Sequence, residues 1–164
     1  MPDILDDRAK LRDELSLRVH ADRDRVGIMD TTTLIASAAT GLMAGVFFAF
    51  STSVMPGLAD LPPEHGRAAM RRLNARIQNP VFLLVFLGTA VVCGIEVVQG
   101  RHVGGLLYLV GVFVLTMVVN VPMNNRLERT DDAYWPEYLR RWTLWNHVRG
   151  VAGLASAVTL PLGL

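Results

Sequence analysis

Long uncharged runs alternate with charged segments along this chain. Charged residues bracket each run. Three of the runs are uncharged over roughly 20 positions, the length that a helix needs to cross about 30 Å of hydrocarbon. They predict membrane-spanning helices at residues 33–55, 80–98 and 103–121.

The last uncharged run, at positions 150–164, is shorter than the others. As a helix it would cover only about 22 Å. A spanning helix must therefore begin a turn earlier, which draws Asn146, His147 and Arg149 to the membrane boundary or below it. We predict a fourth span at residues 146–163, with a tilted or half-inserted end as the alternative.

Two long links and one tight turn join these segments. The first link, residues 56–79, contains a stretch at 64–78 with apolar residues on one helical side and arginine, asparagine and glutamine on another. This pattern is typical of a helix that lies in the membrane interface. The sequence therefore predicts an all-α fold: a four-helix transmembrane bundle, up-down-up-down, with an interfacial helix between the first and second spans.

The first 30 residues form a charged tail ahead of a membrane domain at residues 31–164. Apolar residues at positions 4, 11, 15 and 19 recur on one side of a helix. We expect a peripheral helix there. Met29 is an alternative start of the protein, and the tail would then have no role.

The distribution of arginines predicts the orientation in the membrane. The threading puts both long links on one side, where they hold eight arginines against four near the membrane on the other side. The positive-inside rule therefore places the links at 56–79 and 122–146 in the cytoplasm. Glu96 lies near the opposite end, and we expect its side chain to reach the interface.

The first segment carries a face of small residues, which lets helix backbones approach closely in lipid. Gly41 and Gly45 form a GxxxG pair on this face. We expect the face to pack against another helix of the same chain. A seam in a homo-oligomer is the alternative.

Composition and charge exclude several classes of protein. Charged residues make up 19% of the chain, against about 25% in ordinary soluble domains. The net charge of +1 gives no indication of a nucleic-acid partner. Cys93 is the only cysteine, which excludes an intramolecular disulfide, a cysteine zinc site and dithiol chemistry. The histidines are far apart and no phosphate or dinucleotide loop is present, so we predict neither a metal nor a cofactor.

The remaining polar residues gather at the end of the bundle that carries the long links. Asn120 and Asn124 share a helical face around Pro122, and the interfacial helix contributes Arg71 and Asn74. A further group precedes the fourth segment: Trp142, Trp145, Asn146, His147 and Arg149. Aromatic belts and hydrogen bonds between helices are the plainer structural interpretations. Ionisable groups at membrane depth are costly, however, and are therefore candidates for a functional site.

Two motifs in these segments are fairly specific as a pair. They are Asn120-Val121-Pro122-Met123-Asn124 and Trp142-Thr143-Leu144-Trp145-Asn146-His147-Val148-Arg149. With matching stretches in the first segment and before Asn79-Pro80, the chain resembles the anthrone oxygenase-like family of small integral membrane proteins. The resemblance covers about residues 30–164. It implies an activity associated with fungal members, oxidation of an anthrone to an anthraquinone by dioxygen without metal or flavin. Most bacterial members have no known activity.

The chemistry of such an oxidation points to roles for the polar residues. An anthrone that loses its benzylic proton becomes an electron-rich carbanion, which reacts with dioxygen directly. His147 is the candidate base. The candidate donors to the developing oxyanion are Asn124, Asn146 and Arg149. The candidate substrate contacts are Trp142, Trp145, Asn74, Arg71 and Asn120.

A second function stays open at this point. The chain could be a non-catalytic membrane module that binds a lipid, a small lipophilic ligand or a protein partner. A transporter is the weakest alternative, because the first three segments carry no charge at mid-membrane depth.

Overall fold

The computed structural model describes the backbone of residues 4–164 and the side chains of residues 10–18 and 31–164. This part of the chain is almost entirely helical and has no strand, so the predicted all-α class is confirmed. The elements are, in order, α1 (Ile4–Ala49), η1 (Phe50–Val54), α2 (Met55–Ala59), α3 (Pro63–Ile77), α4 (Pro80–Val98), α5 (His102–Tyr108), η2 (Leu109–Val114), η3 (Thr116–Asn120), α6 (Val121–Arg129), η4 (Asp132–Tyr134), α7 (Trp135–Thr159) and η5 (Leu160–Leu162).

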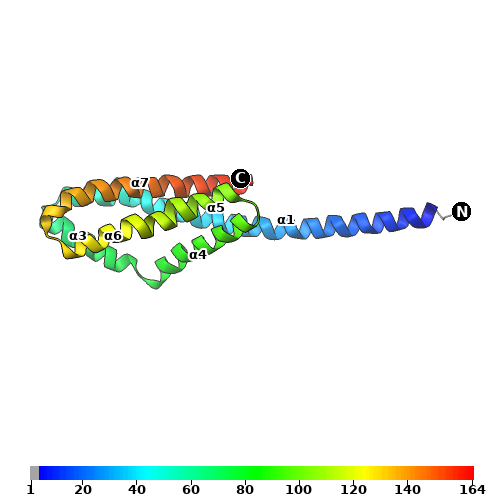
Figure 1. Cartoon of the computed structure of the whole chain (residues 1–164), viewed down its shortest axis with the longest axis horizontal. Coiled ribbons are helices and arrows are strands. Elements are labelled where there is room, and N and C mark those ends of the chain that lie inside the picture. Colours follow the sequence, from blue (N-terminus) through cyan, green and yellow to red (C-terminus); the bar gives the residue numbers. More distant parts are fainter. Residues whose placement is uncertain (1–3) are drawn as a thin grey trace.

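The second half of α1, α4, the continuous helix from α5 to α6, and α7 lie side by side (Figure 1). The first half of α1 extends beyond them as one uninterrupted helix (Figure 1). The tail is thus helical from Ile4 and runs directly into the first apolar segment. The side chains described in it, at residues 10–18, are exposed.

Three helical stretches are long and apolar enough to cross a membrane, and they match the three long uncharged runs. They are Thr31–Ala59, Pro80–Val98 and His102–Arg129. The predicted fourth span lies in α7, which begins at Trp135 rather than near residue 146 and is not among the three. The predicted helix at 64–78 is present as α3.

The surface of the helices is apolar where a soluble protein would be polar. Large hydrophobic side chains are exposed along all the long helices, for example Phe48, Leu84, Val91 and Val118. Polar side chains such as Thr40, Asn120 and Asn146 are instead buried between the helices. This inverted distribution is expected when hydrocarbon is the solvent.

α1 and α7 pack closely through small residues. A Cβ on Gly153 would lie 3.3 Å from the Cβ of Ala44, so the two backbones approach with little space between them. Ser37 Oγ donates a hydrogen bond to the carbonyl of Ala157 at 2.6 Å across the same contact. Of the predicted GxxxG pair, Gly41 faces this contact, since a Cβ on it would lie 3.8 Å from the Cβ of Ala157, whereas Gly45 is exposed and a Cβ on it would meet nothing within 4 Å.

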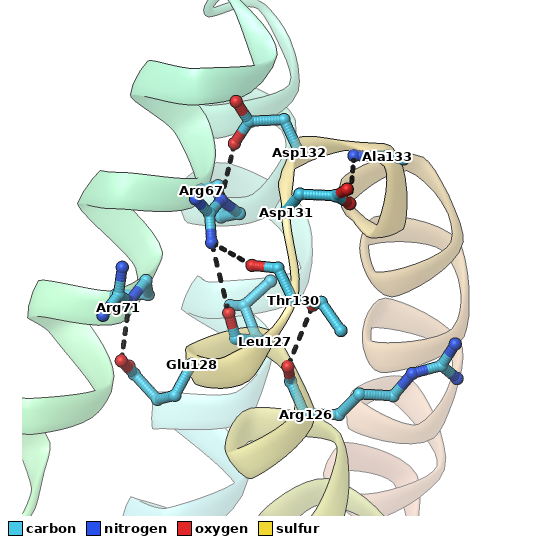
Figure 2. A network of polar contacts seen from close by, with 9 residues as sticks. All are labelled: Arg67, Arg71, Arg126, Leu127, Glu128, Thr130, Asp131, Asp132 and Ala133. Atoms are coloured by element: carbon cyan, nitrogen blue, oxygen red, sulfur yellow. Dashed lines mark hydrogen bonds and ion pairs between the residues drawn. The ribbon is translucent and has the colours of Figure 1, made fainter.

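α3 is held against the link between α6 and α7 by a polar network (Figure 2). Arg67 donates hydrogen bonds to the carboxylate of Asp132 and to the carbonyls of Leu127 and Thr130. Arg71 pairs with Glu128. Beneath this network lies an aromatic cluster that includes Trp135 and Tyr138. The two long links are thus joined into one cap over the end of the helices.

Glu96, expected at the interface, is fully buried at the opposite end. One carboxylate oxygen accepts a hydrogen bond from Thr33 at 3.0 Å and lies 3.3 Å from Arg101. Arg101 comes from the tight turn after α4, and Thr33 from α1. The glutamate therefore turns inward because a cation and a hydroxyl are available there, and it ties three segments together.

Candidate functional site

A cavity of about 280 Å³ lies between the helices at the end that the cap covers. Its apolar lining comes from Val46, Phe47, Phe50, Leu73, Ile77, Phe82, Leu83, Phe86, Leu87, Met117 and Val121. Its polar and amphipathic lining comes from Asn74, Gln78, Thr116, Asn120, Asn124, Asn125, Trp142, Asn146 and Arg149. No aspartate, glutamate, histidine or lysine belongs to this set, so the only formal charge on the wall is that of Arg149.

Arg149 is the central polar group of the cavity. Its side chain is buried, and within the described side chains no carboxylate lies within ion-pair distance of it. The guanidinium lies 4.5 Å from the ring centre of Phe47 and 5.4 Å from that of Trp142. These ring faces stabilise a cation only partly. A buried cation without an anionic partner is costly to maintain, which makes it a candidate for ligand binding.

Two neighbours fix the orientation of this guanidinium. Arg149 donates to the Oδ1 of Asn146 at 2.6 Å and to the Oγ1 of Thr116 at 3.1 Å. Asn146 in turn donates to the carbonyl of Phe47 and to Ser51 Oγ, both at 2.6 Å. The side chain of Asn146 therefore cannot rotate without breaking several hydrogen bonds, and it links Arg149 of α7 to Phe47 of α1 and Ser51 of η1.

Asn124 organises the aromatic side of the cavity. Its Oδ1 accepts hydrogen bonds from the Tyr138 hydroxyl at 2.8 Å and from Trp142 Nε1 at 2.9 Å. Burial raises the pKa of the Tyr138 phenol above its usual value, so the hydroxyl stays a neutral donor. The two rings stack, with centroids 6.2 Å apart. Asn124 thus fixes the wall of Trp142 that faces the cavity.

Some hydrogen-bonding capacity in the cavity is unused. Neither amide atom of Asn120 has a partner, although the residue is only 1% exposed, and Arg149 Nε is also unpaired. Unpaired buried polar groups are uncommon and costly. Both residues line the cavity, but the unpaired atoms themselves are covered by neighbouring atoms, so a bound molecule reaches them only if these side chains move.

The structure brings together six of the nine residues that the sequence indicated. Those on the cavity wall are Asn74, Asn120, Asn124, Trp142, Asn146 and Arg149. Three others lie elsewhere. Arg71 pairs with Glu128 on the outer side of α3, and Trp145 packs half-buried against the aromatic cluster.

The third, His147, corrects the predicted grouping with Asn124 and Arg149. It is exposed and lines a separate hollow of about 330 Å³ between α1 and α7, next to Gly45 and Ser51. One residue corresponds to about 100° of rotation on a helix. Because Asn146 faces inward, the next residue turns out of the bundle.

Sequence reasoning missed several wall residues. Thr116 lies one helical turn before Asn120, so the same-face spacing that pairs Asn120 with Asn124 could have indicated it. Phe47 and Phe86 carried no such signal in otherwise apolar runs. Among the described residues, no group of three or more His, Cys, Asp or Glu side chains lies together as a metal ion would require.

Comparisons with known proteins agree with the motifs. The sequence model of a family described as anthrone oxygenase matches residues 67–159. This stretch runs from within α3 to the end of α7 and includes all the polar residues of the cavity wall. Searches of curated proteins and of solved structures found no match. Since the match covers more than half of the chain, the protein belongs to the anthrone oxygenase family.

Proposed function

We propose that the protein is a multi-pass membrane oxygenase that oxidises a flat, lipophilic, anthrone-like carbon acid with dioxygen. The observation that carries this proposal is the buried cation of Arg149, which has no anionic partner among the described side chains, in a cavity walled by uncharged amide, aromatic and aliphatic side chains. An enolate of a polycyclic aromatic ketone would match such a site in both charge and shape. The charge would meet the guanidinium and the rings would meet the apolar walls.

Membrane placement of α7 as a fourth span is part of the proposal. From Leu144 onward its exposed side chains are mostly apolar, including Val151, Leu154 and Val158. The carbonyl of Leu164 accepts a hydrogen bond from the Gly104 amide at 3.0 Å. The C-terminal end thus lies beside the start of α5, and α7 has the same extent as the helices that are apolar enough to span.

The proposed reaction is balanced without a further reductant. Loss of the benzylic proton gives an enolate, whose negative charge lies partly on the keto oxygen near Arg149. Dioxygen adds to the carbanion carbon, and protonation gives a hydroperoxide. Loss of the second benzylic hydrogen with cleavage of the O–O bond gives the quinone carbonyl and water. One oxygen atom enters the product, and the other leaves as water.

The proton acceptor in this proposal is water or hydroxide rather than His147. The cavity wall contains no carboxylate or imidazole, and His147 faces away from it. Gln78 and Asn125 are exposed where the cavity approaches the cap, which offers a polar path for water. A cation near the keto oxygen lowers the pKa of the bound carbon acid, so a weak base suffices.

The test is dioxygen consumption by the purified, detergent-solubilised protein with anthrone as the probe. We expect equimolar dioxygen uptake and anthraquinone formation, unchanged by a chelator. The rate should rise with pH as the enolate fraction grows, without the inflection that a histidine base gives near its pKa of about 6.5. His147→Gln should therefore keep full turnover. Tight binding of anthrone without any oxidation would instead favour the non-catalytic binding module.

A further inference from the structure

The exposed residues of the cavity wall fall into two groups of different character, from which we infer two openings. Beside the cap, the exposed wall residues are the polar Gln78 and Asn125. On the flank, between α4 and η3, they are Leu83, Leu87 and Met117, with exposed fractions of 39%, 45% and 43%. One opening therefore suits water, and the other presents only hydrocarbon side chains.

The flank opening arises from the course of α4. This helix packs against α1, α5 and η2, and it diverges from the α5–α6 helix toward its own first turn (Figure 1). The cavity occupies the space between its first turns and η3. The neighbouring residues on the same two elements, Leu84 and Val118, are exposed by 74% and 63%. The opening thus lies within an apolar belt on the outside of the helices.

We propose that this flank opening, between Leu83 and Leu87 of α4 and Met117 of η3, is an entrance from the lipid phase. The ligand is then an uncharged, flat molecule dissolved in the bilayer, and the polar opening serves water. An anion would lose its hydration in this mouth without gaining a partner. The ligand therefore enters as the neutral acid and meets Arg149 only inside. Its identity as an aryl ketone rests on the proposed function.

An entrance has a kinetic signature that differs from that of a ligand contact. Narrowing the flank opening raises the free-energy barrier for ligand entry and for ligand exit by the same amount. Association and dissociation therefore slow by the same factor, and the dissociation constant is unchanged. Removing a contact with the bound ligand changes the dissociation constant, mostly through the dissociation rate. Turnover is not needed to see this difference.

The test uses protein reconstituted in phosphatidylcholine vesicles and anthraquinone as the probe. We expect the bound quinone to quench the fluorescence of Trp142, because this residue lines the cavity. In the double variant Leu87→Phe/Met117→Phe, both rate constants should fall at least about tenfold with an unchanged dissociation constant. Phenylalanine adds bulk without adding a fluorophore. The matched control is Leu84→Phe/Val118→Phe, which adds the same bulk on the same elements outside the mouth and should leave both rates unchanged.

Three outcomes would overturn the proposed entrance. The first is that ligand association slows in Gln78→Phe/Asn125→Phe but not in Leu87→Phe/Met117→Phe. The second is that Leu87→Phe/Met117→Phe changes the dissociation constant while the association rate stays the same, and the third is that anthraquinone does not quench the wild-type fluorescence. A wild type that binds with the expected kinetics but does not oxidise anthrone would contradict the proposed function and still support the entrance. The two proposals can therefore fail separately.

Discussion

Arg149 is held in an unusual electrostatic position for a residue that only stabilises the fold. Its charge is buried without an acidic partner, and holding such a charge in the interior is costly. Arg149→Met removes this cost but leaves Asn146 Oδ1 without its donor, which costs about 1–3 kcal/mol, so we expect only a small change in the melting temperature in detergent. Turnover of anthrone should fall about 10²–10³-fold, as when an oxyanion donor is removed. A variant that unfolds, or one that keeps its turnover, would show that the arginine is structural.

Asn124 has the opposite character, because its carbonyl satisfies two buried donors. Asn124→Leu leaves the Tyr138 hydroxyl and Trp142 Nε1 unpaired, which should lower stability by about 2 kcal/mol or more. Tyr138→Phe is the matched control. It removes one hydrogen bond without leaving a buried donor unpaired, and should cost only about 1 kcal/mol. Thermal unfolding in detergent measures both, and equal losses would contradict the proposed role of Asn124.

The sequence could predict much of the site at this scale because the motifs follow helical spacing. Asn120 and Asn124 lie one turn apart, and Asn146 and Arg149 lie three residues apart, so each pair faces inward together. His147 could not be placed this way. Its position depends on which face of α7 packs inward, and that is decided by Gly153 and Asn146 contacting α1.

At the scale of elements, the start of α4 follows a local capping pattern in the sequence. Asn79 accepts a hydrogen bond from the amide of Phe82, and Pro80 opens α4, as the Asn-Pro pair indicates. The sequence did not predict that α7 begins at Trp135, because this residue follows the 3₁₀ turn η4 directly, with no loop between the two elements. The π-helical segments were also missed. They shift the side-chain register near the cavity, and no residue pattern in the sequence predicts them.

The α1–α7 contact includes Gly153, where even a Cβ would be a tight fit against Ala44. Gly153→Val would force methyl groups against Ala44, and overpacking of this kind costs about 1–3 kcal/mol. Gly45→Val is the control, since a Cβ there would meet nothing within 4 Å. We expect a clearly lower melting temperature for the first variant only. Similar losses at both positions would mean that helix propensity, not packing, is the cause.

At the scale of the whole molecule, the predicted orientation rests on the arginines of the two long links and can be tested by labelling. Cys93 is fully buried, so the wild type provides an unlabelled background. With a membrane-impermeant maleimide, Ala68→Cys and Ala133→Cys should label only in inside-out vesicles. His102→Cys and Leu162→Cys should label only in right-side-out vesicles. Labelling of Leu162→Cys on the same side as Ala68→Cys would show that α7 does not span.

The central claim is that the cavity stabilises an enolate through Arg149. It can be tested most directly without dioxygen, where no oxidation intervenes. Anthrone is added anaerobically to the wild type and to Arg149→Met, and the absorbance of the enolate is followed as pH is raised. We predict that anthrone bound to the wild type ionises at a lower pH than free anthrone, and that this difference disappears in the variant. Bound anthrone that stays the neutral ketone in the wild type, or ionises equally in both proteins, would contradict the account.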